Sequence, residues 1–173
     1  IDITVSPFQL GRESPSGIGG LAFSPHRVEV LLDCEREDLE NVIRKEMTAV
    51  LAHELNHSAR MALTAPAKTL GDCVVLEGLA CYFESTVCDG ELPSLFADIK
   101  SHDWKEIYRR FKPYLTDEAF SFDNLFHGGD PEIFPRYAGY WVGYNLIADY
   151  IENNTANDVD LLGLESELFY LDE

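Results

Sequence analysis

The segment HELNH, His53 to His57, contains two histidines four residues apart with a glutamate directly after the first. In an α-helix, positions four apart lie almost above one another, so both imidazoles can point to one side and share a metal ion. Glu54 lies one position around the helix, where it can reach a water beside the ion without binding the ion itself. This H-E-x-x-H pattern is typical of zinc hydrolases, in which the glutamate is the general base.

A zinc hydrolase needs a third protein ligand and leaves the fourth position to water. No third histidine follows at the spacing H-E-x-x-H-x-x-G-x-x-H, which excludes the all-histidine metzincin class. We therefore expect an acid on a following helix, and Glu77 is an ionisable side chain in the mostly apolar segment VVLEGLACYFES. A lone buried carboxylate is costly unless it has a partner, which a metal would supply. The sequence thus predicts one Zn²⁺ held by His53, His57 and Glu77.

Three neighbours of Glu77 bear on this site. Glu84 lies seven residues later, on the same helix face, and is either a rival ligand or a hydrogen-bond partner for a histidine. A third interpretation is a surface acid near the helix end, which we favour over ligation. Cys81 is within reach of a soft metal, but we favour a small buried core residue. Gly78 would let two helix backbones approach closely.

Peptide hydrolysis also requires a hydrogen-bond donor for the charge that develops on the carbonyl oxygen. The segment PRYAGYWVGY offers Tyr137, Tyr140 and Tyr144, and His127 precedes it. We choose Tyr140, because the glycines around it would let this helix lie close to the helices that carry the metal ligands. The alternative is that these tyrosines are core aromatics whose hydroxyls bond to the backbone. The sequence leaves open which of Tyr137, Tyr140 and His127 would act.

The elements that must position these residues are helices that follow a small β section. Residues 2–5 and 28–32 have the β-branched, apolar character of strands, with a short strand at 21–23 between them. Apolar residues at helical spacing predict a helix from about 39 to 63, and a more apolar one covers 70–87. Further helices are expected at 92–99, 102–114, 117–125, 135–154 and 158–171.

This order predicts an α+β fold, in which a small N-terminal antiparallel β section precedes a mainly helical bundle. A chain of 173 residues without repeats or linker composition is most simply one domain, residues 1–173. The chain begins at Ile1 rather than Met, and IDITV already has strand character. We therefore expect the N-terminus to be truncated.

The net charge and the number of cysteines restrict the possible functions and the expected cellular location. Thirty-one acids against thirteen bases give a formal net charge of −18, which argues against nucleic-acid binding. We favour a solvated acidic surface as the reason, and attraction for cationic substrates or metal ions is the alternative. No apolar run is long enough to span a membrane. Four cysteines are too few for a disulfide scaffold, so we expect reduced thiols and a cytoplasmic location.

Four motifs together resemble a known family. HELNH followed by LEGLA, with GIGGLAF upstream and RYAGYWVGYNL downstream, is similar to the bacterial predicted zinc-dependent proteases long catalogued as a domain of unknown function, the YjaZ-like group. More broadly, the chain resembles the gluzincin branch of zinc peptidases, over most of its length. The resemblance implies a zincin-like architecture, with His53 and His57 as helix ligands, Glu54 as general base and Glu77 as third ligand.

The chain departs from the gluzincin pattern at one position. Many gluzincins carry an acid four residues after the ligand glutamate, where this chain has Cys81. That acid supports a ligand histidine through a hydrogen bond. Glu84, Asp72 or a backbone carbonyl would have to replace it.

These residues predict a zinc-dependent metallopeptidase whose substrate is a peptide or protein. The alternative is a zinc-binding regulatory or interaction module without catalysis, but metal binding alone does not need Glu54. A third function is hydrolysis of a non-peptide amide or ester, which the shape of the pocket would decide. The segment SGIGGLAFS is either an exposed edge strand that takes an extended peptide or a tight turn that enters a hairpin. The sequence predicts no oligomeric state.

Overall fold

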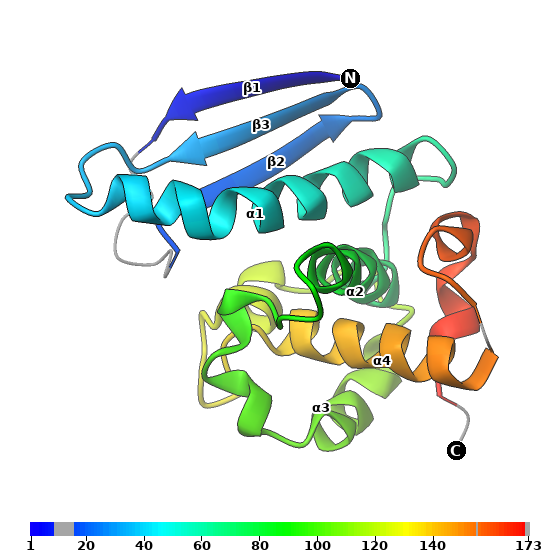
Figure 1. The fold of residues 1–173 in the computed structure, drawn as a ribbon. Coiled ribbons are helices and arrows are strands. Elements are labelled where there is room, and N and C mark those ends of the chain that lie inside the picture. Colours follow the sequence, from blue (N-terminus) through cyan, green and yellow to red (C-terminus); the bar gives the residue numbers. More distant parts are fainter. Residues whose placement is uncertain (9–15, 155, 172–173) are drawn as a thin grey trace.

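The computed structural model describes residues 1–8, 16–154 and 156–171 (Figure 1). Three strands come first and helices follow, which confirms the predicted α+β class. The strands are β1 (Asp2–Pro7), β2 (Ile18–Ser24) and β3 (Arg27–Leu32), and the longer helices are α1 (Leu39–Met61), α2 (Leu70–Val87), α3 (Trp104–Phe111) and α4 (Ala138–Asn154).

The strands form one sheet in the order β1-β3-β2. β2 and β3 are antiparallel, but β1 runs parallel to β3, so the prediction of a wholly antiparallel section is wrong for this pair. The physical reason lies in the connections. Pro25 and His26 join β2 to β3 directly, which forces a hairpin, whereas the longer segment after β1 lets the chain cross to the far side of β3. The strand expected at 21–23 extends over the whole of β2.

Helix α1 lies between the sheet and the remaining helices (Figure 1). Its apolar side packs against β2 and β3, where Ile18, Val30, Leu32 and Val42 form one buried cluster. Side chains alternate across a strand, so one face of each of these strands is apolar and covered by α1. This packing holds β2 directly beside the helix that carries the HELNH segment.

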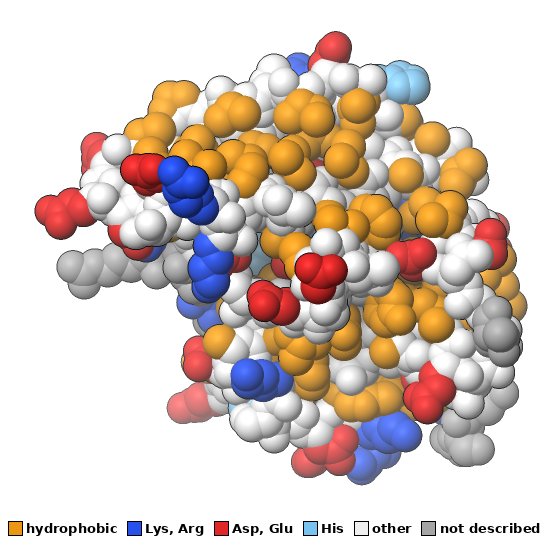
Figure 2. All heavy atoms as spheres, viewed as in Figure 1, with side chains coloured by type: hydrophobic (Ala, Val, Ile, Leu, Met, Phe, Trp, Pro, Cys, Tyr) orange, Lys and Arg blue, Asp and Glu red, His pale blue; other side chains and the backbone are white. Residues whose placement is uncertain are grey.

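Strand β1 lies beyond the part of the sheet that α1 covers. Ile3 and Val5 pair in register with Val28 and Val30, so all four point to the same face of the sheet. Val28 and Val30 are fully buried, whereas Ile3 and Val5 stay exposed because α1 packs mainly under β2 and β3. Figure 2 shows hydrophobic side chains gathered over this part of the molecule.

Helices α2 and α4 cross in close contact below α1 (Figure 1). A capping box starts α2, because the Thr69 hydroxyl accepts the Asp72 N–H and the Asp72 carboxylate accepts the Thr69 N–H. At the crossing, Gly78 meets Gly143, and a Cβ added at Gly143 would lie 2.1 Å from the carbonyl oxygen of Val74. Two glycines therefore set the distance between these helices. Among the described residues, no helix combines the length and apolar character of a membrane span.

The predictions of helices at 92–99, 117–125 and 158–171 are wrong in detail, because short helical turns form in these segments. Phe96 and Ile99 are three residues apart and both buried, a spacing that tight 3₁₀ turns satisfy. Gly163 interrupts the last segment, since glycine weakens a helix interior. The turns are Ser94–Phe96, Ile99–Ser101, Asp123–His127, Asp160–Gly163 and Ser166–Phe169, and a further turn, Lys112–Tyr114, extends α3.

We expect Gly143→Ala to lower the free energy of unfolding by about 1–3 kcal/mol, because the new methyl group must push α2 and α4 apart. Urea unfolding monitored by circular dichroism measures this change. Gly163→Ala is the matched control, since no atom lies within 4 Å of its added Cβ, and its effect should stay within about 1 kcal/mol of zero. Equal stability of the Gly143→Ala variant and the unaltered protein would contradict the proposed role of this contact.

Candidate metal centre

The candidate ligands come together where α1 lies beside α2. His53 and His57 project from one side of α1, with their ring centroids 4.7 Å apart. The Oε2 atom of Glu77 on α2 lies 3.2 Å from Nε2 of His53 and 3.4 Å from Nε2 of His57. One carboxylate oxygen thus faces two imidazole nitrogens from two different helices.

These distances can be compared with a zinc site. Zinc bound by imidazole and carboxylate at about 2.0–2.1 Å in tetrahedral geometry keeps its ligand atoms about 3.3–3.4 Å apart. The two distances from Oε2 of Glu77 are close to this value, and the three ligand atoms all lie within 4.8 Å of one another. The nitrogen and oxygen donors are also those that zinc prefers. The residues therefore fit a zinc ion with little rearrangement.

Among the carboxyl groups of the site, Glu77 has the pKa that departs most from its usual value. Only 9% of its surface is exposed, and burial alone would raise its pKa. The nearby His57 and hydrogen bonds with both histidines outweigh burial and hold the pKa of Glu77 well below its usual range. The group is therefore a buried anion, which requires positive charge beside it.

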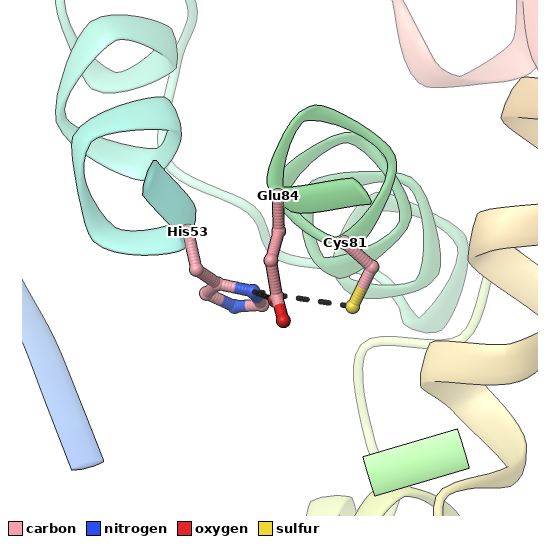
Figure 3. Close-up of side chains that lie close together, drawn as sticks. All are labelled: His53, Cys81 and Glu84. Carbon is pink, nitrogen blue, oxygen red and sulfur yellow. Dashed lines mark hydrogen bonds and ion pairs between the residues drawn. The ribbon is translucent and has the colours of Figure 1, made fainter. Parts of the chain in front are cut away.

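The other ring nitrogen of His53 points to the end of α2 (Figure 3). Its Nδ1 lies 3.2 Å from Oε2 of Glu84 and 3.9 Å from Sγ of Cys81. Glu84 is 8% exposed, so its interpretation as a surface acid is wrong. Its position one turn beyond Cys81 still faces α1, which lets it reach back to the ring. A carboxylate that accepts the Nδ1–H fixes the ring so that Nε2 faces Glu77.

Cys81 and the Nδ1 atom of His57 also belong to the surroundings of the candidate ligand atoms. Cys81 is fully buried, and burial raises the pKa of its thiol to about 12. It is therefore a neutral core side chain at the position where many gluzincins have an acid. The Nδ1 atom of His57 is buried, and the described residues give it no hydrogen-bond partner. His53 thus has a carboxylate that orients its ring, whereas His57 does not.

Glu54 lies on the same helix and faces an open cleft. Its side chain is 7% exposed, and burial raises its pKa despite the opposing effect of His53 and His57. A raised pKa brings a carboxylate closer to the value that suits proton transfer near neutral pH. The arrangement separates the two acids, since Glu77 faces the histidine nitrogens and Glu54 faces the cleft.

The cleft beside these residues has a volume of about 700 Å³. β2 forms one wall through Ile18, Gly19 and Gly20, and α1 forms another through Glu46, Val50, His53 and Glu54. The opposite wall contains Asp123, His127, Gly128, Gly129, Arg136, Tyr137 and Tyr140. A volume of this size is in the range of small-molecule and peptide sites.

All three candidate hydrogen-bond donors line this opposite wall. The Tyr140 ring lies 6.5 Å from the His53 ring and 6.4 Å from the His127 ring, measured between centroids. Burial and nearby carboxylates raise the pKa of Tyr140 well above its usual value, so its hydroxyl keeps its proton. Tyr137 has a backbone φ of 65°, a left-handed conformation that is rare for an aromatic residue and common at functional sites.

Some cleft residues were not singled out from the sequence. Glu46 lies seven residues before His53 and so shares its helix face, a signal that was available. Gly20 and Arg136 gave no such signal, because their roles depend on which segments meet in space. Arg136 lines the cleft and stacks over the Tyr137 ring, with its guanidinium carbon 4.7 Å from the ring centroid.

Comparison with known proteins identifies the family. The family described as "Predicted Zn-dependent protease (DUF2268)" matches residues 16–170. No curated protein and no solved structure gave a match. The matched range begins just before β2 and includes every residue of the cleft and of the candidate metal centre. The chain therefore belongs to the family of predicted Zn-dependent proteases, as its motifs suggested.

Proposed function

We propose that this protein is a zinc-dependent peptidase in which His53, His57 and Glu77 hold the ion. The observation that carries the proposal is the single Glu77 oxygen at 3.2 Å and 3.4 Å from the two imidazole nitrogens. It is supported by the buried Glu84 that orients His53 and by the family description. Glu84 is assigned to orientation of the ring rather than to the ion.

Zinc at this position supplies a Lewis acid that polarises the scissile carbonyl and makes a water easier to deprotonate. Glu54 takes a proton from the attacking water and then gives it to the leaving amine, so the group returns to its starting state. Its buried position at the cleft suits this role, because a raised pKa helps a carboxylate to carry a proton. This use of Glu54 separates the proposal from a zinc-binding module without catalysis.

The walls of the cleft supply the binding of the peptide and the hydrogen bond to its carbonyl oxygen. β2 is an edge strand of the sheet and borders the cleft, so an extended peptide can pair with its free edge. On the opposite wall, the protonated Tyr140 hydroxyl donates a hydrogen bond to the carbonyl oxygen as negative charge develops on it. A peptide held on β2 would then lie between Glu54 and Tyr140.

The metal assignment predicts different results for two buried acids of α2. Glu77→Gln should abolish tight zinc binding, because a neutral amide replaces the anionic ligand. Glu84→Gln should keep one zinc per chain with an affinity lower by about tenfold or more, since it alters only the support of His53. Titration with a chromophoric zinc chelator measures both. Stoichiometric zinc in the Glu77→Gln variant would remove Glu77 from the site.

The catalytic assignment predicts that Glu54→Gln keeps zinc and fold but lowers peptide hydrolysis by roughly 10²-fold or more, because an amide cannot accept the proton. Cleavage of a diverse peptide library, followed by mass spectrometry, measures this loss. Glu40→Gln is the control, because Glu40 is exposed on the first turn of the same helix. Equal turnover of the Glu54→Gln and unaltered proteins would exclude Glu54 as the base.

Tyr140→Phe should lower kcat by about 10²–10³-fold with a smaller change in KM, because the lost hydrogen bond forms mainly in the transition state. Steady-state kinetics on a peptide selected from the library measures both constants. Parallel Tyr137→Phe and His127→Ala variants identify the donor. A larger loss of kcat in either of these than in Tyr140→Phe would move the role to that residue.

A further inference from the structure

Strand β2 approaches the side chain of Glu54 closely at Gly20. A Cβ added at Gly20 would lie 2.3 Å from Cγ of Glu54, 2.7 Å from Oε1 and 2.8 Å from Cδ. Real Cβ atoms essentially never come this close to another heavy atom, so any other residue at this position must displace Glu54. The absence of a side chain at Gly20 is therefore what leaves room for the carboxyl group.

The contact also restricts where Glu54 can go. Glutamate has a long side chain with several rotamers, and fixing it in one of them costs entropy. Here the side chain is 7% exposed, and the backbone of β2 closes one side of it. The strand thus closes one side of the Glu54 side chain at Gly20.

We infer that Gly20 is a positioning residue for the general base, and that β2 holds the Glu54 carboxyl group in the place from which it acts. The inference rests on the proposed function, because it assigns the reason for this contact to proton transfer. It adds a second role to β2, whose free edge would also receive the peptide. One strand then fixes both the base and the bond to be cleaved, so their separation does not depend on the packing of more distant elements.

The contact itself is tested by thermal unfolding of a double-mutant cycle that needs no activity. Gly20→Ala should lower Tm by about 2–4 °C in the unaltered protein, since its methyl group meets a buried side chain. In the Glu54→Ala background the same substitution should leave Tm unchanged or raise it, because the space is free and alanine restricts the unfolded chain. Gly163→Ala, whose added Cβ meets no atom, should behave alike in both backgrounds. If Gly20→Ala alone does not fold, recovery of folding in the double variant supports the contact.

Kinetics then separates positioning of the base from binding of the peptide. Gly20→Ala with unchanged zinc content should lower kcat by about tenfold or more, since small misplacements of a reacting group are costly, while KM stays within about twofold. In the Glu54→Gln background, Gly20→Ala should cause no further loss of the residual turnover, because the base it positions is already absent.

Two results would overturn the inference. An equal fall of Tm in both backgrounds would show that Gly20 does not act through Glu54. A raised KM with unchanged kcat would make Gly20 a peptide-binding position instead. If the zinc-loaded, unaltered protein cleaves no peptide, the proposed function fails, and the positioning role of Gly20 fails with it even where the thermal cycle shows the contact.

Discussion

The buried carboxylate of Glu77 is the constraint on which the arrangement of the helices depends. A charged group inside an apolar helix is strongly unfavourable unless positive charge or hydrogen-bond donors surround it. His53 and His57 supply these donors from α1, and their spacing places both on the side that faces α2. The contact between these three candidate ligands is therefore also part of the packing of α1 against α2. Without the imidazoles, the carboxylate would be an uncompensated buried charge.

Close approach of backbones makes this possible in a chain of modest size. Gly78 stands next to Glu77 and meets Gly143 on α4, so the far side of α2 is supported at the point where its near side carries the charge. Gly20 has the same function between β2 and α1, where the neighbour is the side chain of Glu54. In both cases a missing Cβ, rather than an unusual backbone conformation, explains the glycine. Glycines thus allow close packing at two places: Gly78 where α2 meets α4, and Gly20 where β2 meets α1.

The sequence predicted local features well and relations between segments less well. The long helix around HELNH and the helix around Glu77 follow from apolar periodicity and from a motif whose geometry is set within one helix. Glu84 lies near the end of its helix, which suggested that its side chain is exposed to solvent. The crossing of α1 and α2 instead buries this side chain against His53. The parallel pairing of β1 likewise depends on a connection whose path the composition does not fix. Short 3₁₀ turns also bury residues such as Phe96 at spacings that resemble a helix.

The cleft is lined by long helices on one side and mostly by turns on the other. The candidate ligands and Glu54 stand on two long helices, which suits groups that must keep fixed distances. The opposite wall belongs instead to the segment between Asp123 and Tyr140, which includes the left-handed residues Gly128 and Tyr137. Loops and turns can present side chains in directions that a helix does not allow, and strained residues there are commonly tied to function. The candidate ligands and Glu54 thus stand on helices, whereas the opposite wall is built mostly from turns that lead into α4.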